Sequence, residues 1–405
     1  MKITDIQLIH LNPRLARRNT EQKARFRGID TQTLFKVQTD KGITGYGDCR
    51  GHVSLPQAAI EPLIGRTPFD FVNACLTPGL MGALYDVMGK YLEVPAYKLM
   101  GQKVRDRVPV AAWTRPASPE DLAKEVQRAT SEGYLRFKMH TCEYYDVLEQ
   151  NRAVEEVAPE GFKMHYDFNH NRPLTAVLEL VQTLEKSRVV GFIEDPLSWR
   201  DLEGWRRLRE KTYLSLVMHV PQLGGGPEIL YGCADLYMIG ENGSVGKALA
   251  LGFACAEANV STVIQLTGGT LTKALALHLG AVLPNVSHSI NLDDQYEEDA
   301  TGKRIEVLEG SSPVPENPGL GYEVDERELA RIASTPPTEI PRHLGVLHLP
   351  GGHKLYTLSF PSLSKLTGFP EGTLRGLHFQ VWNDDGSTEF AQWYQRVETE
   401  GPVME

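Results

Sequence analysis

The feature that most constrains this sequence is a rhythm of short apolar runs and helix-length segments, which begins near residue 108 and continues to about residue 292. Parallel strands can be joined only by crossovers of that length. Eight such runs therefore favour a closed parallel (β/α) barrel over an open sheet. The apolar runs lie at 108–113, 136–140, 162–169, 189–194, 214–220, 235–239, 261–266 and 288–292. Helical patterns lie at 119–133, 173–186, 246–259 and 270–283, whereas the fifth connection, about 221–234, is short for a full helix.

A chain of 405 residues is too long for one ordinary core, so we expect further parts around the barrel. Residues 1–107 mix strand-like alternation with proline-punctuated helical segments, which indicates an N-terminal α+β capping domain. The barrel is predicted to occupy residues 108–312. Residues 313–405 are predicted to return to the cap and then form an extension. That extension is too rich in aromatic residues for a disordered tail, so we expect a packed appendage, lid or subunit contact.

Net charge and cysteine usage narrow the class of protein. A formal charge of -10 argues against a nucleic-acid or anionic-membrane partner. No apolar run approaches the roughly 18 residues that a membrane span needs, and the N-terminus lacks a signal-peptide pattern. The five cysteines are scattered and show no CxxC spacing, which predicts a protein of the reducing cytoplasm.

Two carboxylates lie at the carboxyl ends of predicted strands, where the catalytic residues of parallel barrels are found. Asp167 and Glu194 each come at the carboxyl end of an apolar run, and in a barrel these ends meet at one mouth. Two hard oxygen ligands on successive strands predict a divalent metal site. The next run, 214–220, carries His219 where a third carboxylate would be expected. Imidazole in place of carboxylate shifts preference from Mg²⁺ toward Mn²⁺, Fe²⁺ or Zn²⁺, and leaves open whether a metal binds.

Candidate proton-transfer groups lie on the second run. Lys138 and His140 are two residues apart, so both side chains share the face that enters the barrel mouth. Histidine titrates near neutrality, which makes His140 a candidate general base with Lys138 as its electrostatic partner. Asn169 shares a face with Asp167 and is predicted to hydrogen-bond the substrate.

Each of these residues also has a structural interpretation. Asp167 and Glu194 could cap helices. Lys138 and His140 could form ion pairs at the barrel mouth. His219 could be an inward-facing histidine whose hydrogen bonds are satisfied within the core.

Several short motifs together resemble one family. In order and spacing the chain is similar, over roughly residues 1–330, to the enolase superfamily in its mandelate racemase/muconate-lactonizing branch. The matching segments are Gly42-Ile43-Thr44-Gly45-Tyr46-Gly47-Asp48, Asp86-Val87-Met88-Gly89-Lys90, Pro95-Ala96-Tyr97-Lys98-Leu99-Met100-Gly101, Ile193-Glu194-Asp195-Pro196 and Pro318-Gly319-Leu320-Gly321.

The resemblance implies a fold and a chemistry. The expected fold is a modified (β/α)7β barrel under an α+β cap. The expected chemistry is Mg²⁺-assisted removal of the proton α to a carboxylate, through an enediolate, by a lysine or histidine base. The family's metal positions fall on Asp167, Glu194 and His219. Its second-strand Lys-x-Lys motif falls on Lys138-Met139-His140.

The resemblance also shows departures from the family pattern. The seventh-strand histidine position falls on Gln265, and the sixth-strand aspartate that would orient it falls on Gly240, next to Glu241. An eighth-strand position that often holds glutamate carries Asn291. We expect Gln265 and Asn291 to contact substrate instead. Loss of the second base argues against racemisation, which needs a base on each face.

A basic segment, with Arg14, Arg17, Arg18, Lys23, Arg25 and Arg27, follows the first predicted strand. The resemblance makes it a specificity lid, with Arg25 as a contact for a carboxylate substrate, although a solvated loop is an equal alternative. The acidic segment 293–299 is expected to be a solvated loop, and His278 on an apolar helix face to be structural.

The first functional hypothesis is a lyase that dehydrates a sugar acid or another hydroxycarboxylate. The alternative is a degenerate, non-catalytic relative that binds a small acid or serves in an assembly, and an epimerase is a weaker third. The partner is predicted to be a small carboxylate, and self-association as a homo-oligomer is expected.

Overall fold

The computed structural model describes residues 1–16, 29–170, 172–241, 244–337, 339, 341–358, 366–369 and 373–405. Arg25 lies outside these residues, as do Arg17, Arg18, Lys23 and Arg27, so their predicted roles remain predictions.

The N-terminal part is a small antiparallel sheet covered by a helix. Strands β1 (Ile3–Leu11), β2 (Gln32–Thr39) and β3 (Thr44–Arg50) pair in the order β1-β2-β3. Helix α3 (Pro78–Leu92) packs closely on the sheet because Gly45 and Gly47 lack side chains: a Cβ on either would lie 2.2–2.3 Å from an α3 carbonyl oxygen. The short α2 (Gln57–Ile60) precedes α3.

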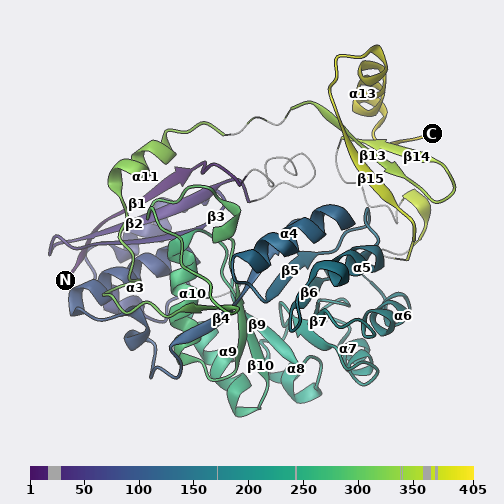
Figure 1. Ribbon diagram of the computed structural model, residues 1–405. Helices are drawn as coiled ribbons and strands as arrows, with labels where there is room; N and C mark the ends of the chain where they lie inside the picture. The colour runs from purple at the N-terminus through teal and green to yellow at the C-terminus, as the bar shows by residue number, and fades with distance from the viewer. Residues whose placement is uncertain are drawn as a thin grey trace.

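Eight parallel strands close into the predicted barrel, and pairing of the last with the first completes the ring. They are β4 (Arg107–Thr114), β5 (Arg136–His140), β6 (Lys163–Asp167), β7 (Val190–Glu194), β8 (Ser215–Met218), β9 (Leu236–Gly240), β10 (Ser261–Gln265) and β11 (Val286–Ile290). Helices α4 (Pro119–Ser131), α5 (Val147–Val157), α6 (Leu174–Leu184), α7 (Leu202–Arg209), α8 (Gly226–Tyr231), α9 (Val245–Glu257) and α10 (Thr270–Val282) form the outer layer (Figure 1). The barrel prediction is confirmed, and the fifth connection holds only the six residues of α8.

Two expectations for the end of the barrel were wrong. The eighth strand is 286–290 rather than 288–292, because the buried segment continues past the strand into a 3₁₀ helix, Asp293–Gln295. Apolar and buried residues therefore do not mark the strand's end. The acidic segment 293–299 is also not simply solvated, since Asp293 and Asp294 are buried. Lys273 Nζ lies 2.9 Å from Asp293 Oδ2, and Arg128 Nη2 lies 2.9 Å from Asp294 Oδ2, so each buried charge is paired.

His278 of α10 joins the barrel to the cap side. Its Nδ1 accepts a hydrogen bond from the backbone N–H of Tyr97 at 3.3 Å, and its Nε2 lies 3.3 Å from the carbonyl oxygen of Leu320. Burial lowers the pKa of His278 to about 4, so the ring is neutral at pH 7.

The C-terminal part forms a second antiparallel sheet beyond the barrel (Figure 1). After β12 (Ser311–Pro313) and α11 (Glu326–Ala333), strands β13 (His343–His348), β14 (Lys354–Thr357), β15 (His378–Asn383) and β16 (Val403–Met404) pair in the order β15-β13-β14-β16. Helix α13 (Thr388–Glu400) covers one face. The other face packs through Phe379 on Tyr144 and Tyr145, in the loop that follows β5, with ring centroids 5.5 and 6.0 Å apart.

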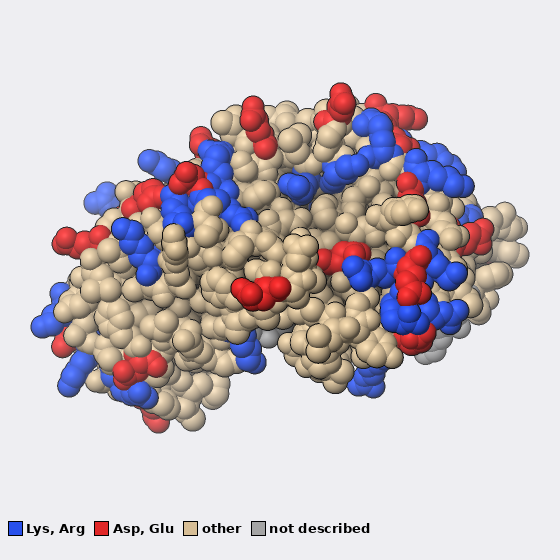
Figure 2. All heavy atoms as spheres, turned by 90° about the horizontal axis from the view of Figure 1, so that it is seen from below, with Lys and Arg blue, Asp and Glu red and all other residues tan. Residues whose placement is uncertain are grey.

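The surface seen from below mixes both signs of charge: acidic and basic side chains are interspersed among broad uncharged areas (Figure 2). Within the described ranges, no helix is long and apolar enough to cross a membrane.

Candidate active site

Lys138 lies at the centre of the barrel mouth and is fully buried. Its Nζ is 2.6 Å from Glu194 Oε2 and 3.1 Å from Asp167 Oδ2, and it donates a hydrogen bond to Gln265 Oε1 at 2.9 Å. Burial alone would lower the pKa of Lys138, but the charges of Glu194 and Asp167 raise it above its ordinary value. Lys138 is therefore a fixed ammonium, which can stabilise negative charge but cannot accept a proton.

Glu194 connects this ammonium to two histidines. Its Oε2 lies 2.7 Å from His165 Nε2, and its Oε1 lies 3.2 Å from His219 Nδ1. His165 in turn lies 3.1 Å, Nδ1 to Nε2, from His288 of β11, and both rings are fully buried inside the barrel. Despite burial, these partners hold the pKa of Glu194 well below its usual range, so it is a carboxylate.

A possible metal-binding group is formed by Glu194, Asp195 and His219, whose ligand atoms all lie within 4.8 Å of one another. Asp195 has a left-handed backbone, with φ 45°, and its Oδ1 accepts a hydrogen bond from the backbone N–H of His219 at 3.0 Å. Two carboxylates and an imidazole are donors that suit a divalent ion, and the imidazole favours Mn²⁺, Fe²⁺ or Zn²⁺ over the Mg²⁺ that the resemblance implies. The predicted ligand Asp167 is instead in contact with Lys138 and His140.

Burial and the neighbouring charges determine the protonation states of Asp195 and His219. Burial, followed by the negative charges of Glu194 and Asp167, raises the pKa of Asp195 to about 8. Burial opposes the charged form of His219, but its hydrogen bond to Glu194 raises the pKa of the ring overall. Protons thus neutralise part of the acidic cluster when no cation does so.

The second-strand candidate base, His140, is held by two oxygens. Asn169 Nδ2 donates to the carbonyl oxygens of Thr141 and Asp167, which turns Asn169 Oδ1 toward His140 Nδ1 at 2.9 Å. Asp167 Oδ2 is 3.2 Å from the same nitrogen. Two acceptors at Nδ1 favour the tautomer that is protonated there, which leaves the lone pair on Nε2. The side chain is 35% exposed, so Nε2 can be reached by a ligand.

Gln265 links Lys138 to an acid that the sequence prediction did not place in the site. Its Nε2 donates to Glu241 Oε2 at 2.6 Å, and Arg50 of the cap lies 3.5 Å from Glu241 Oε1. By contrast, Asn291 Nδ2 donates to the carbonyl oxygen of Leu266, and its Oδ1 accepts from Ser289 Oγ. The Asn291 amide thus has a partner in the barrel wall at each end.

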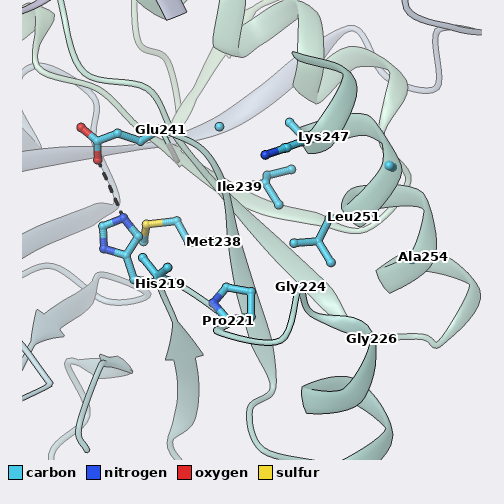
Figure 3. Close-up of a pocket in the computed structure, with 14 residues that line it drawn as sticks. His219, Pro221, Gly224, Gly226, Met238, Ile239, Glu241, Lys247, Leu251 and Ala254 are labelled. Carbon is cyan, nitrogen blue, oxygen red and sulfur yellow. Dashed lines mark ion pairs between the residues drawn. The ribbon is translucent and has the colours of Figure 1, made fainter. Parts of the chain in front are cut away.

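An apolar cavity of about 600 Å³ adjoins the site at His219 (Figure 3). His219 and Glu241, whose Nε2 and Oε2 are 3.8 Å apart, line it together with residues of β9 and α9. The short α8 and the small side chains of α9 leave this space open. Its apolar walls are formed by Val220, Pro221, Met238, Ile239, Ala248, Leu251 and Ala254.

Comparison with known proteins identifies a family and several relatives of this chain. The profile of the family described as "Enolase C-terminal domain-like" matches residues 121–328. A D-galactonate dehydratase of Variovorax paradoxus is 28% identical over an alignment 360 residues long, which covers 75% of this chain and 91% of the relative. A D-gluconate dehydratase of Thermoproteus tenax is 27% identical over an alignment 375 residues long, which covers 79% of this chain and 73% of the relative.

Solved structures share the fold. The muconate lactonizing enzyme of Pseudomonas putida is 20% identical, with a TM-score of 0.67, and the likeness covers 82% of this chain and 99% of that one. An N-succinyl Arg/Lys racemase from Bacillus cereus is 22% identical, also with a TM-score of 0.67, and the likeness covers 83% of this chain and 99% of that one.

Proposed function

Since the chain belongs to the enolase superfamily, with the C-terminal domain of the mandelate racemase/muconate-lactonizing enzymes, we propose that it removes the proton α to a carboxylate and dehydrates a hydroxycarboxylate of the sugar-acid type. The observation that carries the proposal is the placement of Lys138 and His140: a buried ammonium, and a partly exposed imidazole whose Nδ1 faces two oxygens, which favours a lone pair on Nε2. The similarity to two sugar-acid dehydratases supports the substrate class.

In this mechanism the substrate carboxylate lies beside Lys138, and His140 Nε2 takes the α proton. Lys138 stabilises the charge that develops on the carboxylate oxygens, because a fixed ammonium in a buried site needs little reorganisation. Asn169 and Asp167 orient the ring and stabilise the imidazolium that forms. The β-hydroxyl then leaves as water after taking a proton from His140, and the enol that remains becomes a 2-oxo-3-deoxy acid.

Asp167, Glu194 and His219 are the proposed metal residues. Glu194 and His219 form a possible ligand group with Asp195, whereas Asp167 contacts Lys138 and His140. A divalent ion held there would supply further positive charge to the substrate carboxylate. We propose that the site is atypical for the family, because imidazole stands at the third ligand position and Gln265 at the position of the second base. An amide cannot exchange a proton at neutral pH, which argues against an epimerase.

The alternative is a degenerate relative that binds a small acid without turnover. One observation favours it: Lys138 Nζ already neutralises both Asp167 and Glu194, which lessens their need for a metal ion. A protein of this kind would bind acids and release them unchanged.

The test is product formation from galactonate and gluconate, with Mg²⁺ or Mn²⁺, followed by NMR of the 2-oxo-3-deoxy acid. His140→Asn should abolish the product. His170→Asn is the matched control, because the His170 ring packs on Trp199 instead, with centroids 3.9 Å apart and ring planes tilted by 35°. Equal turnover by wild type and His140→Asn would exclude His140 as the base, and acid binding without product would favour the alternative.

A further inference from the structure

Arg115 is an unusual buried charge. It follows β4 directly, its side chain is only 1% exposed, and it is one of the largest fully buried side chains in the described ranges. Neither Nη1 nor Nη2 has a hydrogen-bond partner in the part of the chain that the structure describes. Burial lowers the pKa of Arg115 to about 10, so the guanidinium is still charged at pH 7. A buried charge whose N–H groups lack hydrogen-bond partners is costly for a fold, and a structure that retains one calls for an explanation.

The position of Arg115 directs this charge toward the barrel mouth. Ala111 and Trp113 of β4 lie in the interior cluster of the barrel, and Arg115 continues this alternation two residues further on. Tyr296 packs in the same interior cluster, and the carboxylate of Asp30 favours the charged form of Arg115 without a hydrogen bond to Nη1 or Nη2. Strand pairing aligns Trp113 with Lys138 and Thr114 with Met139. The same register, continued by one residue past the end of β4, would place Arg115 beside His140.

Arg115 also lies across the mouth from the metal-binding group. Strand β4 is four positions from β8 in the ring of eight parallel strands, so Arg115 and His219 stand on opposite sides. A ligand that reached from one to the other would pass over Lys138 and His140, the residues proposed to carry the reaction.

We propose that Arg115 binds a second anionic group of the substrate, so that the preferred substrate is a hydroxy diacid that spans the barrel mouth. The two free Nη groups form the planar fork that matches the two oxygens of a carboxylate. One carboxylate lies beside Lys138, where the α proton is removed, and the other pairs with Arg115. This inference deepens the proposed function and rests on it for the position of the reacting carboxylate.

The test uses the full-length chain and two matched pairs of acids in isothermal titration calorimetry. Tartrate is compared with threonate, and galactarate with galactonate, so that each pair differs only in the second carboxyl group. The variants are Arg115→Gln, which removes the charge, and Arg115→Lys, which keeps the charge but loses the fork. Arg136→Gln is the control, because Arg136 is a largely buried arginine at the start of β5, the opposite end of the barrel.

We expect wild type and Arg136→Gln to bind at least one diacid about 10- to 100-fold more tightly than its monoacid, the range for a hydrogen-bonded charge. Arg115→Gln should lose the difference, and Arg115→Lys should keep only part of it. Without ligand, Arg115→Gln should melt at or above the temperature of wild type, because it removes a buried charge whose Nη groups have no hydrogen-bond partner among the described residues.

Three results would overturn the assignment: no diacid preference in wild type, a preference that persists in Arg115→Gln, or a lower melting temperature of ligand-free Arg115→Gln. The last would show that the guanidinium serves the fold. Binding is measured without turnover, so a chain that prefers diacids but forms no product would support the anion site while refuting the dehydratase.

Discussion

Lys138→Met is the change that most clearly exposes the electrostatics of the site. It replaces a fully buried ammonium by an apolar side chain of similar length and leaves Glu194 and Asp167, formerly 2.6 and 3.1 Å from the charge, without their cation. Removal of one partner from a buried ion pair costs about 3–5 kcal/mol of unfolding free energy. Because two carboxylates lose their partner here, we expect a loss toward the upper end of that range.

The same variant should respond to metal. With Lys138 gone, the carboxylates can attract a divalent ion, so Mn²⁺ should bind more tightly and restore part of the lost stability. Lys273→Met is the matched control, since Lys273 forms a separate and equally buried pair with Asp293. Its stability should fall without recovery in Mn²⁺.

The assay is urea unfolding of wild type and both variants, in chelator and in millimolar Mn²⁺. The reasoning would be refuted by a Lys138→Met protein within about 1 kcal/mol of wild type in chelator, a margin well below the expected loss. Equal recovery of both variants in Mn²⁺ would refute the assignment of the ion to this site.

Three further changes test other parts of the account. The pKa of His278 is lowered to about 4 from 6.5, so below pH 6.5 the unfolded chain gains a proton that the native chain does not. The unfolding free energy of wild type should therefore fall by about 3 kcal/mol between pH 6.5 and 4. Urea unfolding at each pH should show a smaller fall for His278→Gln. Asn169→Leu removes the acceptor at His140 Nδ1 and should lower kcat about 10- to 100-fold and shift the pH–rate profile, whereas an unchanged profile would exclude an orienting role. Phe379→Ala should loosen the contact with Tyr145 and speed hydrogen exchange in residues 141–146, and unchanged exchange would show that the C-terminal sheet does not support that loop.

The barrel could be predicted because its signal is repeated. Each strand and helix carries its own periodicity, and eight repetitions exclude most other folds. The carboxyl ends of the strands could also be predicted from the sequence. Lys138, Glu194 and His219 were therefore expected near one another, and the structure places them there. Burial of the acidic segment could not be predicted, because the cations that pair with it, Lys273 and Arg128, are distant in sequence.

Other parts of the site depend on geometry that spacing does not encode. His165 lies two residues before Asp167 on the same strand, so alternation could have predicted that it shares the face of Asp167. Its contact with Glu194 could not be predicted from the sequence. Asp195 enters the metal-binding group because its backbone adopts a left-handed conformation. Arg115 is notable only because it is buried without a hydrogen-bond partner among the described residues, and burial of a single arginine is a property of the packed structure.

The central claim is that His140 removes a proton α to a carboxylate, and solvent exchange tests it without requiring the whole reaction. The purified chain would be incubated in D₂O with galactonate and galactarate, in the presence of Mn²⁺. NMR would follow deuterium at C2 of the recovered acid and at C3 of the 2-oxo-3-deoxy product. The account predicts loss of the C2 proton by wild type and by His170→Asn, and none by His140→Asn. Full retention of the C2 proton by wild type, or its loss at the wild-type rate in His140→Asn, would contradict the claim.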